Sequence, residues 1–281
     1  MQRVFRFAPS PNGELHLGHA LSALMVHEAA RAAGARFLLR IEDTDVTRCR
    51  PEFEAQIYDD LRWLGLTWEE PVRRQSEHIG DYRAAIDRLA AMNLVYPAFL
   101  SRAEIAAATV DPAWPRDPDG APLYPPLDRE RDPDEAKRMI AAGTPHTLRL
   151  DMARAAMLAG PLTWREEGTG KSETISAEPE KFGDVMLVGR DRPATYHIAV
   201  VVDDALQGIT DVVRGRDLYE STSVHVLLQK LLGLPAPIYS HHRLILGSDG
   251  RKLSKSNRDT ALRVLRDAGE TPADIRRMVG L

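Results

Sequence analysis

Two histidines three positions apart, His16 and His19, lie in the segment FAPSPNGELHLGHA near the N-terminus. A Pro-Asn-Gly turn precedes them and an alanine- and leucine-rich stretch follows, which predicts a strand, a turn and the start of a helix. Free N–H groups at a helix start bind phosphates, and imidazole N–H groups can donate to the same oxygens. Gly18 has no side chain, so a nucleotide can come close to the backbone. A His-x-x-His pair alone is more often a surface feature, but at a strand-to-helix turn it predicts a phosphate site.

A second cationic motif, GRKLSKSN, spans residues 250–257 and places Lys252 and Lys255 three positions apart. Its glycine and serines predict a flexible loop, and two ammonium groups in such a loop could close over a triphosphate. By itself the motif would be interpreted as an exposed basic loop. A third stretch, GTGKS, has some features of a phosphate-binding loop, but Arg165 stands where that loop needs its first glycine, so a polar turn is the better interpretation.

The composition is that of an ordinary globular protein. The 281 residues suffice for one large domain or about two smaller ones, with 43% hydrophobic and 28% charged residues and no apolar run long enough to span a bilayer. The opening MQRVFRF does not resemble a secretory signal, so the expected location is cytoplasmic. A net charge of -4 argues against indiscriminate nucleic-acid binding. The lone Cys49 excludes an internal disulfide and a multi-cysteine metal site and is interpreted as an incidental thiol.

Hydrophobic periodicity predicts alternating strands and helices in the first third of the chain. Gly34 follows the first helical pattern, and Pro51 and Gly65 mark the start and end of the next. The expected elements are a strand over 3–8, a helix over 17–33, a strand over 36–45, and helices over 51–65 and 81–92.

The later part of the chain is interrupted by seven prolines between Ala108 and Pro133, which predict an excursion from the main fold. Strand patterns resume at HTLRL and LTWREE. The segment TYHIAVVVDDAL is predicted to be a long strand, and YESTSVHVLLQKLLG a helix. The alternation predicts a Rossmann-like α/β fold with a parallel sheet and an inserted subdomain, in which ligands bind beyond the carboxyl ends of the strands. The predicted division is 1–95 and 184–240 for the two halves of the nucleotide-binding core, 96–183 for the insertion, and 241–281 for the cationic loop and a C-terminal helical segment.

The motifs HLGH and KLSKS, in this order around an α/β pattern, resemble the two signatures of class I aminoacyl-tRNA synthetases. The resemblance extends to RFAPSPNGELHLGHA, LLRIEDTD, DLRWLGLTWEE and YHIAVVVDDALQGITDVVRGRDL, which are similar to the catalytic core of glutamyl-tRNA synthetases. The chain ends soon after KLSKS, where a complete glutamyl-tRNA synthetase continues into an anticodon-binding region. It therefore resembles a family of truncated paralogues, the glutamyl-Q tRNA(Asp) synthetases.

The resemblance implies a ligase that uses ATP and Mg²⁺ to convert L-glutamate into glutamyl-adenylate and transfers the glutamate to queuosine in the anticodon loop of tRNA(Asp). The basic stretch from His241 to Arg258 and the C-terminal arginines would contact the phosphates of that loop. A monomer without membrane association is expected. The alternatives are a stand-alone enzyme that charges a tRNA 3′ end, a non-catalytic nucleotide-binding regulatory module, and a structural α/β domain.

The resemblance also assigns roles to matching positions, with two arginines for the two carboxylates of glutamate and Glu42 for its α-ammonium group. Glutamine, with one carboxylate, would leave one arginine unpaired. The implied glutamate-binding residues are Arg6, Ala8, Ser10, Glu42, Tyr196 and Arg214. The implied catalytic residues are His16, His19, Lys252 and Lys255, and the implied ATP-binding residues are His16, Gly18, His19 and Lys255. These groups would align the carboxylate with the α-phosphorus and stabilise developing charge, without a general base.

Many members of the family that the chain resembles bind zinc in the insertion through a Cys-x-Cys pair, a later tyrosine and a further cysteine. Here Ala98 and Leu100 stand at the paired cysteines, Tyr124 matches the tyrosine, and Asp128 falls near the last position. Structural zinc needs four good ligands, so no zinc site is predicted, with apolar packing and proline rigidity in its place. The acids of IEDTD could suggest another metal site, but at the end of a strand they suit recognition of the substrate amine better.

Overall fold

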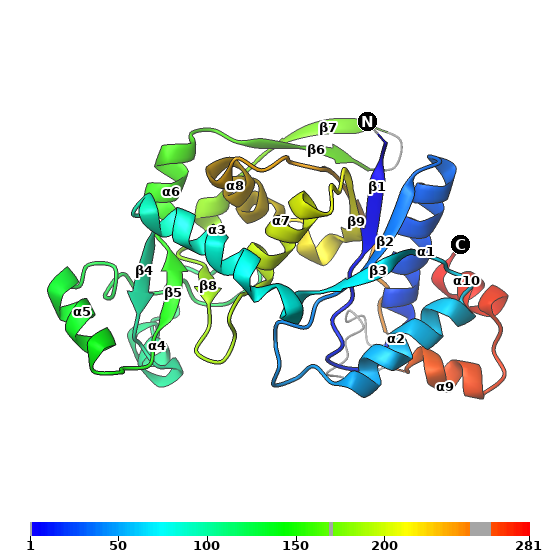
Figure 1. The fold of residues 1–281 in the computed structure, drawn as a ribbon, viewed down its shortest axis with the longest axis horizontal. Helices are drawn as coiled ribbons and strands as arrows, with labels where there is room; N and C mark the ends of the chain where they lie inside the picture. Colours follow the sequence, from blue (N-terminus) through cyan, green and yellow to red (C-terminus); the bar gives the residue numbers. More distant parts are fainter. Residues whose placement is uncertain (1, 169–170, 248–259) are drawn as a thin grey trace.

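The computed structural model describes residues 2–168, 171–247 and 260–281 (Figure 1). Its strands are β1 (Val4–Phe7), β2 (Arg36–Ile41), β3 (Glu69–Arg74), β4 (Val95–Ala98), β5 (Thr147–Leu150), β6 (Thr163–Glu167), β7 (Ser172–Ser176), β8 (Met186–Val188), β9 (Asp211–Gly215) and β10 (Ile238–His242). Its α-helices are α1 (Leu17–Ala32), α2 (Pro51–Trp63), α3 (Ile79–Ala91), α4 (Arg102–Ala108), α5 (Pro133–Ala141), α6 (Met152–Ala159), α7 (Tyr196–Leu206), α8 (Thr222–Leu232), α9 (Leu262–Asp267) and α10 (Pro272–Val279). Short 3₁₀ helices lie at Gln75–His78, Pro179–Phe182 and Arg216–Leu218.

The main sheet has the strand order β3-β2-β1-β9-β10-β6-β7 and is parallel except for the β6–β7 hairpin. Strand β1 pairs with β2 on one side and with β9 on the other, so the chain order switches direction at β1. Apolar side chains of α1, α2 and α10 pack on one face, and those of α3, α7 and α8 form a second core beyond the other (Figure 1). The predicted Rossmann-like α/β fold is confirmed, and such a switch point leaves a crevice at the carboxyl ends of the strands.

Most of the predicted elements lie close to their expected positions. The helices expected over 17–33, 51–65 and 81–92 are α1, α2 and α3, and the strands at HTLRL and LTWREE are β5 and β6. Gly34 has a φ of 58°, in the left-handed region that ends helices, as the glycine at this position predicts.

The strand predicted over TYHIAVVVDDAL is wrong, because Tyr196–Leu206 form helix α7. Seven consecutive residues of this helix, from Ile198 to Asp204, are buried. A segment buried on every side shows neither a helical nor an alternating period, so the periodicity cannot separate the two structures. Two of these buried residues, Asp203 and Asp204, are acids that directly follow the three valines of the helix. The parallel strand of this region comes later, at β9.

A separate antiparallel sheet of order β4-β5-β8 has α4, α5 and α6 around it (Figure 1), and its strand β8 follows the predicted end of the insertion at 183. Strands β6 and β7, whose residues the sequence assigns to the same insertion, instead pair with each other at the edge of the main sheet. Strand β6 joins the main sheet through parallel pairing with β10, in which Tyr239 is opposite Glu166. The division of the chain into four segments remains a prediction.

A buried carboxylate ties the proline-rich part of the insertion to β4. Asp128 accepts hydrogen bonds from the backbone N–H groups of Phe99 (2.8 Å) and Leu100 (3.2 Å) and from the hydroxyl of Tyr124, and it pairs with Arg131 at 2.9 Å. These donors hold the pKa of Asp128 below its ordinary value despite burial. Apolar packing contributes too, since Phe99 and its neighbour Ala98 are buried. The sequence did not predict that a charged group would take part.

Neither a metal cluster nor a membrane span is found in the part of the chain that the structure describes. No group of three or more His, Cys, Asp or Glu side chains is arranged there to hold a metal ion. Every helix within the described ranges is too short or too polar to cross a bilayer.

Candidate active site

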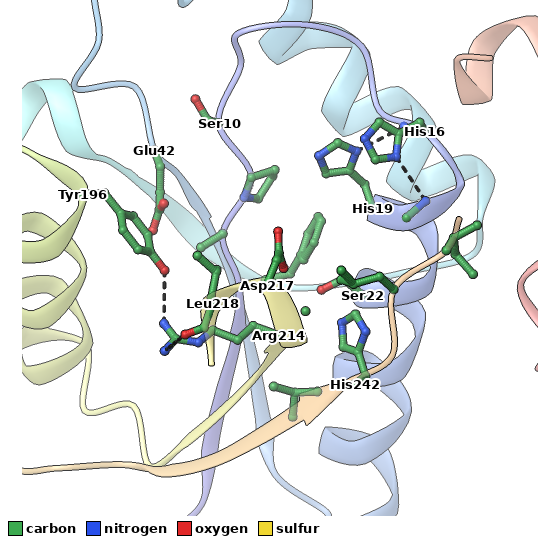
Figure 2. A pocket seen from close by; sticks show the side chains of 18 of the residues that line it. Ser10, His16, His19, Ser22, Glu42, Tyr196, Arg214, Asp217, Leu218 and His242 are labelled. Atoms are coloured by element: carbon green, nitrogen blue, oxygen red, sulfur yellow. Dashed lines mark hydrogen bonds between the residues drawn. The ribbon is translucent and has the colours of Figure 1, made fainter. Parts of the chain in front are cut away.

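A pocket of about 750 Å³ opens at the switch point of the sheet, where β1, β9 and β10 end and α1 begins (Figure 2). Glu42, Tyr196 and Arg214 lie at one end of it, and His16 and His19 lie across from them at the start of α1 (Figure 2). The structure brings together Arg6, Ala8, Ser10, His16, Gly18, His19, Glu42, Tyr196 and Arg214, all of them predicted site residues. The remaining two, Lys252 and Lys255, lie outside the described residues.

The two histidines form a reciprocal cap at the N-terminus of α1. His16 is the N-cap, and its Nδ1 accepts a hydrogen bond from the Gly18 N–H at 3.1 Å, while the His16 N–H donates to Nδ1 of His19 at 3.2 Å. Because both Nδ1 atoms are acceptors, each neutral ring carries its proton on Nε2. A Cβ on Gly18 would lie 3.0 Å from Cε1 of His16, so this glycine also keeps the cap in place. The helix start therefore presents a positive dipole end to the pocket, with two imidazole rings beside it.

Arg214, at the end of β9, is a buried cation surrounded by neutral acceptors. It donates from Nε to Nε2 of His241 (3.1 Å), from Nη1 to the hydroxyl of Tyr196 (3.1 Å), and from Nη2 to Oγ1 of Thr222 (2.7 Å) and the carbonyl of Leu218 (3.0 Å). Within residues 2–168, 171–247 and 260–281, no carboxylate lies within 4.0 Å of its guanidinium nitrogens. A buried charge needs a partner, and the pocket beside Tyr196 is where a substrate carboxylate could supply it.

Two histidines behind Arg214 are kept neutral. His225 lies 3.1 Å from Nη1 of Arg214, and its Nε2 lies 3.2 Å from Nδ1 of His197. Burial and the charge of Arg214 lower the pKa of His197 to about 4 and push that of His225 well below its ordinary value. Neither imidazole therefore adds a positive charge next to the guanidinium of Arg214.

Arg6 also lines the pocket, but its guanidinium fork contacts the protein itself. Nε and Nη2 of Arg6 donate to the two oxygens of Asp204 at 3.0 and 3.3 Å. Arg40 donates to the same carboxylate at 2.7 Å and to Glu42 at 3.0 Å. These buried charges form one chain of ion pairs from β1 and β2 to α7, and Asp204 holds the fork that the sequence assigned to a substrate carboxylate. A role for Arg6 in binding glutamate remains a prediction.

Glu42 lies beside Tyr196 at the pocket wall, and its side chain is 12% exposed (Figure 2). Burial raises the pKa of Glu42, although Arg40 and Arg6 oppose this shift. A bound ammonium group would favour the ionised carboxylate further. The neighbouring acids face elsewhere: Asp43 accepts from the backbone and hydroxyl of Ser76, and Asp45 pairs with Arg48. The acids of IEDTD therefore do not converge on one point.

Sequence reasoning missed several residues around the pocket. Arg40 and Asp204 are charged residues inside apolar runs, which is a signal of a buried ion pair, but the strand predicted for 195–206 concealed the position of Asp204. His241 lies in the stretch that was interpreted as a basic surface, yet its side chain is fully buried. Glu166 belongs to the hairpin assigned to the insertion, and no local pattern connects it to the pocket. Asp217 lines the pocket three residues after Arg214.

Known proteins are similar to this chain over almost its whole length. Residues 3–281 match the family of class I tRNA synthetases (E and Q), catalytic domain. The glutamyl-Q tRNA(Asp) synthetase of Rhodobacter capsulatus is 47% identical over 99% of this chain and 100% of its own length. The enzyme of the same name from Symbiobacterium thermophilum is 38% identical over 96% of this chain and 83% of its own length.

Longer relatives share the same region. A glutamate–tRNA ligase of Prochlorococcus marinus is 36% identical over 95% of this chain, which spans 55% of that ligase. The crystal structure of a glutamate tRNA ligase from Elizabethkingia meningosepticum in complex with its amino acid superimposes with a TM-score of 0.75 at 30% identity, over 92% of this chain and 53% of that one. The chain thus spans about half the length of these ligases. With the family matched from residue 3 to residue 281, the chain belongs to the class I tRNA synthetases of the E and Q group, whose members use ATP.

Proposed function

We propose that the chain activates L-glutamate with ATP to give glutamyl-adenylate and transfers the glutamate to queuosine in the anticodon loop of tRNA(Asp). The observation that carries the first half is Arg214, a buried cation whose hydrogen-bond acceptors are all neutral. The second half is supported by the name of relatives that align over nearly the whole of this chain, at 47% and 38% identity.

The pocket can hold glutamate with its side-chain carboxylate against Arg214 and the Tyr196 hydroxyl, and with its α-ammonium group against Glu42. Glutamine would place a neutral amide against Arg214 and leave the buried charge without compensation, which costs binding energy. Arg6, Ala8 and Ser10 are the proposed walls on the side of β1.

In the proposed reaction an oxygen of the α-carboxylate attacks the α-phosphorus of ATP, the new O–P bond forms, and the bond to pyrophosphate breaks. A carboxylate is already ionised at neutral pH, so no proton has to be removed. The Nε2–H groups of His16 and His19 and the start of α1 would stabilise the charge that develops on the phosphate oxygens. We also propose Lys252 and Lys255 for this role.

Mg²⁺ would neutralise phosphate charge in this reaction and would arrive bound to ATP. Among the described residues, the carboxylates that line the pocket are Glu42 and Asp217, and Glu42 is already paired with Arg40. We propose that the protein acts as a monomer in the cytoplasm, where ATP and tRNA are found. The anticodon loop would contact the basic stretch from His241 to Arg258, in which His241 is buried and Arg243 is exposed, and the C-terminal arginines.

Glutamate-dependent ATP–pyrophosphate exchange tests the activation step. We expect exchange with glutamate, not with glutamine, and without any tRNA. Exchange that starts only after a tRNA is added would favour the alternative, an enzyme that charges a tRNA 3′ end. Absence of exchange under both conditions would favour a non-catalytic nucleotide-binding module.

A further inference from the structure

The β6–β7 hairpin is connected to Arg214 of the pocket through the carboxylate of Glu166 and the ring of His241. Oε1 of Glu166 accepts a hydrogen bond from the backbone N–H of His241 at 2.8 Å, and Oε2 lies 2.8 Å from Nδ1 of His241. The indole N–H of Trp164 also donates to Oε2, at 3.3 Å. The His241 side chain is fully buried and that of Glu166 is 10% exposed, so water does not compete for these contacts.

This arrangement fixes where the proton of His241 lies. An ionised carboxylate only accepts hydrogen bonds, so Nδ1 of His241 must carry the proton that points at Glu166. Nε2 then has a lone pair, and it accepts the Nε–H of Arg214 at 3.1 Å. Burial and the nearby Arg214 lower the pKa of His241, which keeps the ring neutral, while His241 holds the pKa of Glu166 below its ordinary value. The three side chains form an ordered donor chain from Arg214 to His241 to Glu166.

On the basis of the proposed function, we propose that Glu166 and His241 are positioning residues for the substrate carboxylate. Glu166 selects the tautomer of His241, and this tautomer holds Arg214 in its glutamate-binding position. Neither residue lines the pocket. The packing around the ring supports this role, since Tyr239 stacks parallel to His241 with ring centroids 6.1 Å apart, and Tyr219 meets it edge-on at 5.1 Å. These contacts hold the ring in place, so its tautomer decides whether Nε2 presents a lone pair or an N–H group to Arg214.

Two acceptor oxygens are essential for this selection. The side chain of glutamine has the same shape as that of glutamate but offers one acceptor oxygen and one NH₂ donor. In Glu166→Gln, one orientation of the amide sets NH₂ against the backbone N–H of His241. The other sets NH₂ against Nδ1, which stabilises the opposite tautomer and turns an N–H of the ring toward the Nε–H of Arg214. The first orientation leaves two donors facing each other at the backbone of His241, and the second leaves two donors facing each other at Arg214.

The tautomer itself is measurable by ¹⁵N NMR of the histidine rings in the full-length protein, without substrate and without activity. We expect the signals of His241, assigned with the His241→Phe variant, to show the Nδ1–H tautomer in the unmodified protein and the Nε2–H form or a mixture in Glu166→Gln. The matched control is Glu173→Gln, because Glu173 is the exposed cross-strand neighbour of Glu166 on β7. A His241 signal that is already Nε2–H, or protonated on both nitrogens, would overturn the proposal.

Kinetics give the functional half of the test. Arg214 would bind the side-chain carboxylate equally in the ground state and the transition state, so Glu166→Gln should raise the KM for glutamate in pyrophosphate exchange. One disturbed charge-assisted hydrogen bond corresponds to about 10- to 100-fold. The kcat and the KM for ATP should stay within about threefold, and Glu173→Gln should behave like the unmodified protein.

The His241→Phe variant covers the case in which Glu166→Gln does not fold. Phenylalanine keeps the packing against Tyr239 and Tyr219 but removes the acceptor for Arg214, so the KM for glutamate should rise again. A fall in kcat with similar rises in the KM for glutamate and the KM for ATP, together with a lowered melting temperature, would show a merely structural role. If the unmodified protein has no exchange activity, the proposed function fails, while the NMR experiment still decides the tautomer selection.

Discussion

The substitution Arg214→Lys tests the binding of the substrate carboxylate most sharply. Lysine keeps the positive charge but replaces a planar fork by one ammonium group on a flexible chain. The fork of Arg214 is held in place by hydrogen bonds to His241, Tyr196 and Thr222. A single nitrogen cannot reach all of these acceptors and also hold the positive charge beside Tyr196.

The expected loss follows from the contacts that lysine cannot make. Loss of one charge-assisted hydrogen bond to the substrate costs about 1.5–3 kcal/mol, which is roughly 10- to 150-fold in kcat/KM. The loss should appear mainly in the KM for glutamate, because the side-chain carboxylate does not react. Glutamine should remain a poor substrate, because the charge is still present. Steady-state pyrophosphate exchange with varied glutamate and saturating ATP measures both constants.

The control variant is Arg216→Lys, which makes the same exchange at an exposed arginine two residues further along. It should leave the KM for glutamate within about threefold of the unmodified protein. If Arg214→Lys behaves in the same way, or if both variants lose activity equally, the assignment of Arg214 to the substrate carboxylate is refuted.

Three further predictions concern the cap, the buried histidines and the insertion. Gly18→Ala places a methyl group 3.0 Å from Cε1 of His16, so the kcat of exchange should fall about tenfold or more while the melting temperature changes little; unchanged kcat would remove the cap from the mechanism. Because the pKa of His197 is about 4 in the folded protein and about 6.5 when unfolded, the unfolded chain binds more protons between these values. The free energy of unfolding, measured with urea, should therefore decrease as the pH falls from about 6.5 towards 4. In His197→Asn the free energy of unfolding should depend less on pH, and an equally steep pH dependence would contradict the lowered pKa of His197. Asp128→Ala leaves the N–H groups of Phe99 and Leu100 without their acceptor and should lower the free energy of unfolding by about 1–3 kcal/mol per group, while elemental analysis should find no stoichiometric zinc and a strong chelator should leave the fold intact. One zinc per chain would show that the insertion has been misinterpreted.

The sequence predicts the parts of the site that depend on local pattern. The turn before HLGH and the helical period after it are enough to place His16 and His19 at the N-terminus of α1, and the pattern of the next segment places Glu42 at the end of β2. A strand, a helix and a parallel strand bring these ends together, because the carboxyl ends of parallel strands meet at one edge of the sheet.

The parts that were missed depend on contacts between distant segments. Asp204 holds Arg6 across 198 positions of sequence, and its helix could not be distinguished from a strand because it is buried on all sides. Glu166 reaches His241 because β6 pairs with β10, and no local pattern encodes that strand order. Tertiary pairing decides which polar residues near a site are buried, and local periodicity does not contain that information.

The acceptor of the glutamate is the central claim, and transfer to tRNA tests it most directly. Radiolabelled glutamate and ATP are supplied with tRNA(Asp) from cells that make queuosine and from cells that cannot make it. Transfer to queuosine predicts that only the modified tRNA is labelled and that the label survives removal of the 3′-terminal adenosine, since the ester would be on the cyclopentene-diol of a base exposed in the anticodon loop. Equal labelling of both tRNAs, or labelling of tRNA(Glu) at its 3′ end, would contradict it.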